Sequence, residues 1–259
     1  MGLRLALCQY KAEIGNVGAN LNKIMTAVSQ TKSDVYIFPE LFLTGYGADY
    51  ASLSEDVQYA VDKIRLWCVE MDIAILVGAP SYPPNGVRNS IFFITPTDMI
   101  RYDKLYLARF GVYSEKEFVR GDRPTIASFK DMTFGLSICY DIFFPEIYRN
   151  YALSCVDMNV CIAASAVPSK PYFERILPAR SLENLVYTVF VNSTGNSEEL
   201  EFYGSSRLLG PLGNTCGELG GEEGVLCVYV DKDVIKNARK ERKHLDDRRI
   251  DIKWSPDFI

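Results

Sequence analysis

The chain has 259 residues, and 48% of them are hydrophobic, so it can bury one large core. Its formal net charge is −5, and acidic and basic residues are interspersed, which argues against nucleic-acid binding and against a basic membrane-binding face. No apolar run approaches the length of a membrane-spanning helix, and the first residues pass directly into a strand pattern without a signal peptide. We therefore expect a cytoplasmic protein with neither a nucleic-acid nor a membrane partner.

Short apolar runs of strand length alternate with amphipathic segments of helix length along the chain. Strands are predicted over residues 3–10, 35–39, 73–80, 90–95, 99–105, 134–138, 159–164, 187–192, 207–213 and 224–230. Helices are predicted over residues 20–30, 53–71, 144–151, 173–185 and 231–242, the last capped by Asp231 or Asp233. There is no Ser/Gly-rich linker and no internal repeat, so residues 1–259 are predicted to form a single domain of the α/β (α+β) class.

The chain contains seven cysteines, an odd number. Five of them lie in apolar stretches of the sequence: Cys8, Cys139, Cys155, Cys161 and Cys227. This pattern is typical of free thiols in a reducing compartment, where disulfides are rare. No Cys-x-x-Cys pair occurs, so the spacing of metal ligands is absent, and we expect neither a metal nor another cofactor.

Cys139 stands out because of its setting. A short apolar strand ends abruptly at this residue, and Pro145 begins a helix soon after. A strand-to-helix turn exposes a side chain and leaves free backbone N–H groups beside it, which suits a nucleophile. The only histidine, His244, lies in a charged stretch near the end, so the base for such a nucleophile would be a carboxylate or a lysine. From these residues alone, a buried cysteine without a chemical role is an equal alternative.

Two other strands end in, or contain, a polar residue with chemical potential. Glu40 follows Pro39 among apolar residues, so burial would raise its proton affinity and make it a competent base. Lys104 lies in a strand between aromatic and aliphatic residues, where it could stabilise an oxyanion. Plainer interpretations are a structural carboxylate for Glu40 and a surface lysine on an edge strand for Lys104. The loop acids Glu115 and Glu117 would by default be solvated.

Three segments, in this order and at this spacing, resemble the nitrilase superfamily of carbon–nitrogen hydrolases. They are Phe38-Pro39-Glu40 with Gly45-Tyr46, Tyr102-Asp103-Lys104, and Cys139-Tyr140-Asp141 with Phe144-Pro145-Glu146. Residues 179–184, 202–206 with 210–213, and 248–251 look like later landmarks of that family, so the likeness covers almost the whole chain. The resemblance implies a four-layer αββα sandwich.

The resemblance also implies a Glu–Lys–Cys active site formed by Glu40, Lys104 and Cys139. In this scheme Glu40 takes the thiol proton and Cys139 attacks the carbonyl carbon of an amide. The Lys104 ammonium and the Tyr140 backbone N–H hold the oxyanion, and water activated by Glu40 then hydrolyses a thioester.

Many members of that family carry a second active-site glutamate, for which Glu115 is preferred here. Glu117 is the alternative, because the loop lacks the usual proline before Gly121. Further substrate contacts are expected at Tyr46, Tyr113, Tyr140 and Ser165. Tyr140-Asp141 after the cysteine looks like the amidase and carbamoylase branches, whereas true nitrilases usually carry Trp-Glu, so an amide is favoured over a nitrile.

The leading hypothesis is therefore an amidase that cleaves a non-peptide C–N bond of a small amide and releases ammonia or an amine. The alternatives are a glutaminase that supplies ammonia to a synthetase partner, a nitrilase, and a non-catalytic scaffold of the same fold. The family likeness implies a homodimer or larger homo-oligomer, with helices 144–151 and 173–185 and the tail 245–259 at the interface. An aromatic-rich stripe would line that interface unless it faces the core: Phe143, Phe144, Ile147, Tyr148 and Tyr151.

Overall fold

The structure is a computed structural model that describes residues 2–110, 115–197, 200–249 and 251–252. Tyr113 lies outside the described residues, as do residues 250 and 253–259 of the predicted tail. Within the described part of the chain, no helix combines the length and the apolar character needed to cross a membrane.

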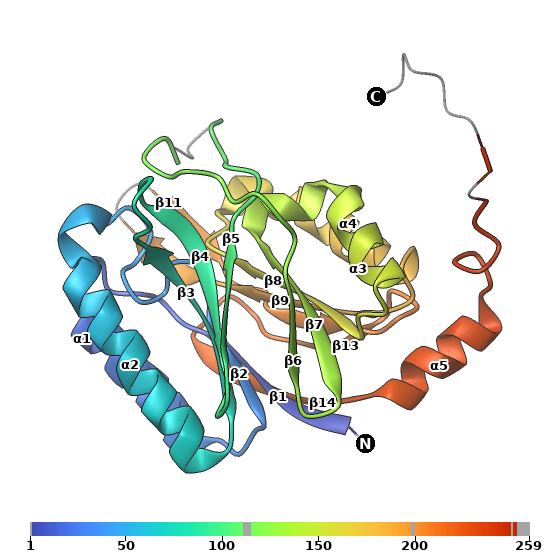
Figure 1. Cartoon of the computed structure of the whole chain (residues 1–259), viewed down its shortest axis with the longest axis horizontal. Coiled ribbons are helices and arrows are strands. Elements are labelled where there is room, and N and C mark those ends of the chain that lie inside the picture. Colours follow the sequence, from blue (N-terminus) through green and yellow to red (C-terminus); the bar gives the residue numbers. More distant parts are fainter. Residues whose placement is uncertain (1, 111–114, 198–199, 250, 253–259) are drawn as a thin grey trace.

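Two six-stranded sheets lie face to face at the centre of the molecule (Figure 1). The first has the order β14-β1-β2-β3-β4-β5, formed by β1 (Gly2–Gln9), β2 (Val35–Ile37), β3 (Ala74–Ser81), β4 (Arg88–Ile94), β5 (Met99–Asp103) and β14 (Gly224–Asp231). The second has the order β13-β12-β9-β8-β7-β6, formed by β6 (Ile126–Phe129), β7 (Met132–Ile138), β8 (Met158–Ala163), β9 (Tyr187–Asn192), β12 (Arg207–Leu209) and β13 (Thr215–Glu218). The central strands of each sheet are parallel and the outer strands antiparallel.

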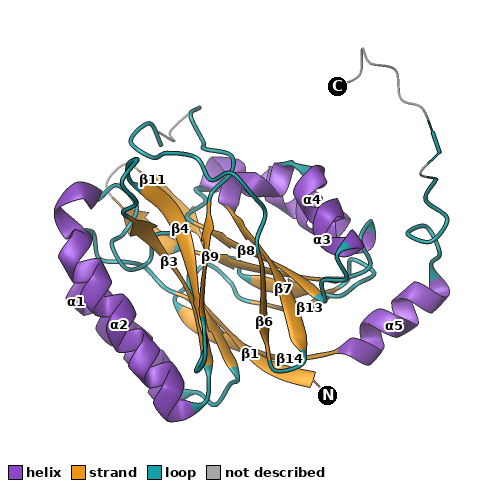
Figure 2. Cartoon of the chain, in the orientation of Figure 1, coloured by secondary structure: helices purple, strands orange, loops and turns teal. Residues whose placement is uncertain are grey.

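Helices cover the outer face of each sheet (Figure 2). On one side of the molecule are α1 (Val17–Gln30) and α2 (Ser54–Met71), and on the other are α3 (Pro145–Leu153) and α4 (Lys170–Leu182). The last helix, α5 (Lys232–Glu241), follows β14 and leads away from the sheets. Shorter elements are the 3-10 helices η1 (Tyr50–Leu53), η2 (Cys139–Phe143) and η3 (Val167–Ser169), and a hairpin of β10 (Thr194–Ser197) and β11 (Leu200–Tyr203). The four-layer αββα sandwich predicted from the sequence is confirmed.

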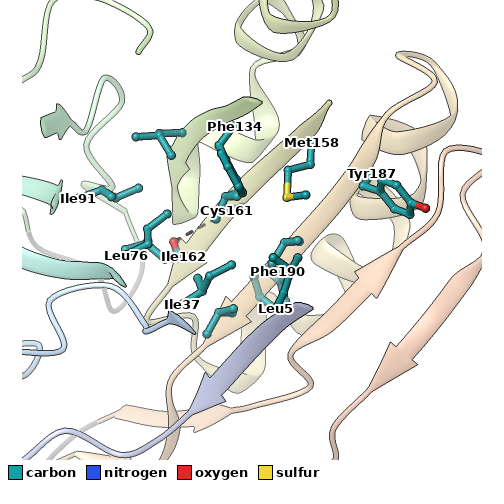
Figure 3. Close-up of a cluster of buried hydrophobic side chains, with 14 of the residues drawn as sticks. Leu5, Ile37, Leu76, Ile91, Phe134, Met158, Cys161, Ile162, Tyr187 and Phe190 are labelled. Atoms are coloured by element: carbon teal, nitrogen blue, oxygen red, sulfur yellow. Dashed lines mark hydrogen bonds between the residues drawn. The ribbon is translucent and has the colours of Figure 1, made fainter. Parts of the chain in front are cut away.

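The alternation of side chains along the strands divides the core into layers. On β3, Ala74 and Leu76 pack in the cluster between the sheets, whereas Ile75 and Val77 pack in the cluster beneath α1 and α2. Figure 3 shows the layer between the sheets, where Leu5, Ile37, Leu76 and Ile91 of the first sheet lie near Phe134, Met158, Ile162 and Phe190 of the second. This apolar contact fixes the sheets against each other and therefore fixes the relative position of their strand ends.

Local sequence signals set the helix ends. The side-chain oxygen of Asn16 accepts the N–H of Ala19 at 3.1 Å and so caps α1. Pro145 occupies the first turn of α3, where its missing N–H leaves no bond unmade. Asp231 caps α5 by accepting the N–H of Asp233 at 2.9 Å, which settles the choice between these two residues.

The differences from the predicted elements lie at boundaries and at short strands. β5 ends at Asp103, so Lys104 follows the strand and does not lie in it, and α4 spans Lys170–Leu182 where residues 173–185 had been predicted. Four strands were not predicted: β6, β10, β11 and β13. Each has four residues, too few to establish an apolar alternation in the sequence.

Two cysteines expected in apolar surroundings are exposed in the structure. Cys155 lies in the turn after α3, where its φ of 60° is left-handed, and Cys227 points outward from the edge strand β14. Cys8 and Cys161 are buried, in agreement with their apolar sequence neighbours. Cys139 is buried as well, although its turn was expected to expose the side chain. Apolar sequence neighbours therefore misled the prediction at a turn and at a sheet edge, where alternate side chains face solvent.

The aromatic stripe around α3 faces the interior and is not an exposed surface. Ile147, Tyr148 and Tyr151 are at most 3% exposed, and Phe143 and Phe144 are partly buried against the same core cluster. Tyr151 packs against β7, where a side chain at Gly135 would overlap its ring. Of the two alternatives for this stripe, an interface or the core, the structure shows the core, because the helix uses the stripe to cover the second sheet.

Candidate active site

The turn after β2 presents Glu40 and needs room beside it. Leu41 has a φ of 50°, in the left-handed region, so the chain turns sharply directly after the glutamate. The turn lies against Gly78 of β3, where a side-chain carbon would come within 2.7 Å of the Glu40 Cα. Gly78 also donates its N–H to the Pro39 carbonyl at 3.2 Å. The missing side chain at Gly78 therefore lets the Glu40 turn approach the neighbouring strand.

Four buried side chains close a ring of hydrogen bonds at the ends of these strands: Glu40, Lys104, Glu115 and Asn89. Lys104 Nζ lies 2.7 Å from Oε1 of Glu40 and 2.7 Å from Oε1 of Glu115. On the other side of the ring, Asn89 Nδ2 donates to the same two oxygens, at 2.7 Å and 3.2 Å. Two carboxylates are thus held together by one cation and one neutral amide.

The remaining carboxylate oxygens bind the backbone. Oε2 of Glu40 accepts the N–H of Ala164 at 2.7 Å, and Oε2 of Glu115 accepts the N–H of Ala108 at 2.6 Å. Every carboxylate oxygen of the ring therefore has a donor. A buried charge that keeps its hydrogen-bond partners avoids most of the penalty for leaving water.

The ring has almost no contact with solvent. The side chains of Glu40, Lys104 and Glu115 are at most 1% exposed. Burial alone would lower the pKa of Lys104, but the negative charges of Glu115 and Glu40 raise it well above its ordinary value, so the ammonium stays protonated. Burial raises the pKa of Glu115, and the charge of Lys104 opposes that rise.

Cys139 forms a turn of its own at the end of β7. Its φ is 47°, which is uncommon for a residue with a side chain, and it begins η2. Burial and the negative charge of Glu40 raise the pKa of its thiol well above the ordinary value. The sulfur therefore carries its proton at neutral pH and has to lose it when it reacts.

Glu40 links the two sheets at this edge. Its partner Ala164 follows β8, the strand that runs parallel to β7 with Ile138 opposite Ile162. Cys139 follows β7 directly, so the glutamate of the first sheet is anchored beside the strand end that carries the thiol. This geometry agrees with the strong electrostatic effect of Glu40 on Cys139.

Asp141 stabilises the turn at Cys139 through hydrogen bonds from the backbone and from a tyrosine. Its carboxylate is fully buried and accepts the N–H of Ile138 at 2.9 Å, the N–H of Tyr106 at 2.9 Å and the hydroxyl of Tyr102 at 2.7 Å. Burial raises the pKa of Asp141 to about 6 from its ordinary value of 3.8. Because Tyr102 and Tyr106 flank Lys104, the Asp141 carboxylate connects the segment around Lys104 to the turn at Cys139.

The predicted substrate contacts lie in different surroundings. The Tyr46 hydroxyl is buried without a hydrogen-bond partner among the described residues, and burial and the charge of Glu115 raise the pKa of Tyr46. Tyr140 is partly buried, and its ring lies 4.9 Å from that of Phe110. Ser165 is fully buried, and its N–H donates to Asn192 Oδ1 at 2.8 Å. Tyr113 lies outside the described residues.

The structure separates the two candidates for a second glutamate. Glu115 is buried in the ring, whereas Glu117 is exposed. Asn89, in contrast, was missed by the sequence analysis. It lies in the polar run Arg88-Asn89-Ser90 that opens an apolar strand, where an asparagine is an ordinary turn residue, so the sequence gives little signal for it.

Chemically, the site combines a carboxylate, a permanent cation and a neutral thiol. The carboxylate can accept the thiol proton as the sulfur attacks an electrophile, and the cation can stabilise the negative oxygen that forms. Tyr140 lies in the first turn of η2, where backbone N–H groups have no acceptor within the helix and can bind the same oxygen.

Comparison with known proteins places the chain. The family model described as "Carbon-nitrogen hydrolase" matches residues 4–240. An "(R)-stereoselective amidase" from Pseudomonas sp is 29% identical over 255 residues, which cover 96% of this chain and 92% of that protein. The solved structure of a CN-hydrolase superfamily protein from Xanthomonas campestris superposes with a TM-score of 0.90, covering 98% of this chain and 100% of that one, and at 23% identity it shows the shared fold.

A second relative is a longer protein. The "Glutamine-dependent NAD(+) synthetase" from Aquifex aeolicus is 29% identical over 264 residues. The match covers 97% of this chain but 45% of that protein, so this chain spans about half the length of the synthetase.

Proposed function

This chain belongs to the carbon–nitrogen hydrolase family and is an amidase-type enzyme, and we propose that it cleaves its amide through a thioester on Cys139. The observation that carries the proposal is the buried ring in which Lys104 contacts both Glu40 and Glu115 at 2.7 Å beside a protonated thiol. Taking several charges out of water costs free energy, so a buried and fully paired charge cluster indicates a functional site.

In the first half of the reaction, Cys139 Sγ attacks the carbonyl carbon while its proton passes to the Glu40 carboxylate. The electron pair of the carbonyl moves onto oxygen, where the Lys104 ammonium and the Tyr140 N–H bind it. The oxyanion then collapses, the C–N bond breaks, and the leaving nitrogen takes the proton from Glu40. Ammonia or an amine departs, and a thioester to Cys139 remains.

In the second half, Glu40 removes a proton from a water molecule as the water oxygen attacks the thioester carbon. The C–S bond breaks, the sulfur recovers the proton, and the carboxylic acid leaves. Glu115 takes no proton in this scheme. Its contact with Lys104 keeps the ammonium fixed, and the raised pKa of Lys104 keeps that group cationic through both steps.

A small amide is the proposed substrate, and a nitrile is less favoured. The fully buried Asp141, which follows Tyr140, binds the backbone of the nucleophile turn and is not available to a substrate. The unpartnered Tyr46 hydroxyl can bind a polar group of the substrate, and Tyr140 and Ser165 are proposed to line the acyl pocket. Tyr113 is proposed to contribute there as well.

A glutaminase that supplies ammonia to a synthetase is the second candidate. The similarity to the Aquifex aeolicus synthetase over 97% of this chain supports it. It requires strict preference for glutamine and a synthetase that receives the ammonia, and this chain spans about half of that protein. A non-catalytic scaffold is disfavoured, because a scaffold has no need of a completely paired charge ring beside a thiol.

We further propose that the enzyme is a cytoplasmic homo-oligomer without a cofactor, formed by one carbon–nitrogen hydrolase domain over residues 1–259. The exposed Tyr172 and Leu182 on α4 and the tail 245–259 are proposed to meet a second copy. His244 touches this region through a contact of 3.1 Å to the Leu182 carbonyl. Light scattering at micromolar concentration tests this, and a monomer would contradict it.

The proposed function is tested by ammonia release over a panel of small amides, ω-amides, glutamine, nitriles and N-carbamoyl compounds. We expect turnover of at least one amide, and a loss of about 10²- to 10⁴-fold in the Glu40→Gln variant because the base is removed. Glu117→Gln is the matched control, since Glu117 is exposed on the same loop as Glu115 and should leave turnover unchanged. Release from nitriles alone, or equal loss in both variants, would contradict the proposal.

A further inference from the structure

We infer that Asn89 is a positioning residue that keeps the Glu40 carboxylate aligned against the thiol of Cys139. The inference rests on the proposed function, because it concerns the base of that reaction. It starts from one observation: a single buried amide nitrogen spans the two carboxylates of the ring.

The two hydrogens of this amide match its two acceptors. Asn89 Nδ2 donates to Oε1 of Glu40 at 2.7 Å and to Oε1 of Glu115 at 3.2 Å. The side chain is fully buried, and its Oδ1 has no hydrogen-bond partner among the described residues. Turning the amide over would set Oδ1 against both carboxylates, so the electrostatics of the ring fix its orientation. Among the described residues, the Asn89 side chain therefore makes its hydrogen bonds to Glu40 and Glu115 alone.

Asn89 and Lys104 act on the same oxygen atoms from two sides. Lys104 supplies the charge, and Asn89 supplies two further hydrogen bonds to the charged forms of the acids. Without Asn89, the carboxylates of Glu40 and Glu115 would repel each other with one donor between them. Glu40 would also lose one of the hydrogen bonds that fix the orientation of its carboxylate.

The backbone of Asn89 makes the arrangement rigid. The residue lies on β4, opposite Pro80 of β3, in a strand paired on both edges. Its carbonyl accepts the N–H of Lys104 at 2.9 Å. Asn89 therefore fixes both the backbone of Lys104 and the side chain of Glu40. A shift of about 1 Å in such a group can cost about 100-fold in rate.

Asn89 is the uncharged member of the site, which makes its role separable. The titratable groups that interact electrostatically with Glu40 all remain in an Asn89 variant; they are Lys104, Glu115, Cys139, Cys161, Tyr46 and Tyr50. Removing the amide changes no charge, so a fall in kcat without a change in KM reports the lost alignment of the carboxylate. A purely structural asparagine would lower stability and leave the kcat of the folded enzyme in place.

The test measures kcat and KM for wild type, Asn89→Ala and Asn89→Ser with an amide from the panel, and the folded fraction of each by denaturant unfolding. For Asn89→Ala we expect the kcat of the folded enzyme to fall about 10- to 100-fold with KM little changed, since the fully buried Asn89 donates to the two carboxylates. Asn89→Ser keeps one donor, so its kcat should lie between the other two.

Asn159→Ala is the matched control, because Asn159 is equally buried on β8 of the other sheet and neither of its side-chain polar atoms has a partner among the described residues. It should leave the kcat of the folded enzyme unchanged. The inference is overturned if the kcat of folded Asn89→Ala equals that of wild type, or, where Asn89→Ala does not fold, if that of Asn89→Ser does. This failure is distinguishable from failure of the proposed function, in which Glu40→Gln would retain wild-type turnover.

Discussion

The two sheets supply the site with opposite kinds of chemistry. The first sheet contributes a charged cluster in which every carboxylate oxygen of Glu40 and Glu115 has a hydrogen-bond donor. The second contributes an uncharged thiol on a left-handed turn, with the pKa of Cys139 raised by burial and by Glu40. One region is stabilised by complete pairing, and the other is kept neutral until it reacts.

This difference shows where reactivity arises. Buried charges persist in the first region because none is left without a partner, whereas the thiol of the second needs no partner while it is protonated. The two regions meet through the hydrogen bond from Ala164 to Glu40, which anchors this carboxylate at the other sheet. Among the described residues, Glu40 and Glu115 are the carboxylates whose charges raise the pKa of the Cys139 thiol, and Glu40 has the larger effect.

The largest effect is expected from removing the neutral thiol of Cys139. Cys139→Ala should fold and lose about 10⁴-fold or more in turnover, because the proposed mechanism forms its acyl intermediate on this thiol. Cys8→Ala is the matched control, since Cys8 is also buried, packs in the cluster beneath α1 and α2, and should keep near wild-type turnover. Ammonia release measures both variants. Substantial turnover by Cys139→Ala would remove the thiol from the mechanism.

The next largest effect is expected from removing the cation of the charged cluster, Lys104. Lys104→Met leaves two buried carboxylates facing each other, so we expect a loss of about 3 to 5 kcal/mol in the free energy of unfolding. Turnover should fall about 10²- to 10³-fold, because the oxyanion loses its cation. Denaturant unfolding and ammonia release measure the two losses.

Lys236→Met is the control for that variant. Lys236 also makes an ion pair of 2.7 Å, with Asp233, but both side chains are largely exposed. Solvent screens such a pair, so the variant should leave the unfolding midpoint where it is. Equal destabilisation by the two substitutions would mean that burial does not distinguish the two pairs.

A smaller effect concerns the pH dependence of stability at the nucleophile turn. The folded-state pKa of Asp141 is raised from 3.8 to about 6, so its contribution to stability is fully present below pH 3.8 and is lost as the pH rises through 6. This rise corresponds to on the order of 3 kcal/mol, at about 1.36 kcal/mol per pKa unit. The stability of wild type relative to Asp141→Asn should therefore decline by that order between about pH 3.5 and pH 7.

Urea unfolding of both proteins at constant ionic strength measures this decline. Asp141→Asn should also be less stable overall, because an amide cannot accept all three hydrogen bonds that Asp141 accepts. The informative quantity is the difference between the two proteins as the pH changes. A difference that stays constant across this range would show that Asp141 does not titrate there.

The smallest expected effect is at the only histidine. His244 is exposed, and its ring contacts the Leu182 carbonyl, far along the chain from the thiol and the ring. His244→Ala should keep turnover within about twofold and change stability by no more than about 0.5 kcal/mol. Kinetics and light scattering on the same sample separate chemistry from assembly. A hundredfold loss of turnover with an unchanged mass would replace Glu40 with an imidazole as the base.

Much of the architecture could be predicted because strand length and helix periodicity are local properties. The long apolar strands and the helices were found this way, and the strand that stops at Cys139 marked the turn that carries the proposed nucleophile. The family resemblance supplied the layer order, which no local pattern contains. The four-residue strands escaped because they carry too few residues to show an alternation, and two cysteines were misplaced because apolar neighbours do not reveal which face a side chain takes.

The site was harder to predict from the sequence than the fold. Glu40 and Lys104 were proposed because they interrupt apolar stretches, but the choice between Glu115 and Glu117 depended on a loop whose register the sequence leaves open. The role proposed for Asn89 could not be predicted, because it depends on contacts with residues 49 and 26 positions away in the chain. Contacts of this kind exist only once the strands are placed side by side.

The central claim is that Cys139 carries the acyl group between the two halves of the reaction, and trapping that intermediate tests it most directly. Wild-type enzyme is mixed with a good amide substrate, quenched rapidly and digested, and the Cys139 peptide is weighed by mass spectrometry. We expect an adduct with the mass of the acyl group, and hydroxylamine should convert it to the hydroxamate. If the peptide stays unmodified during turnover and no hydroxamate forms, water attacks the amide directly and Cys139 is not the nucleophile.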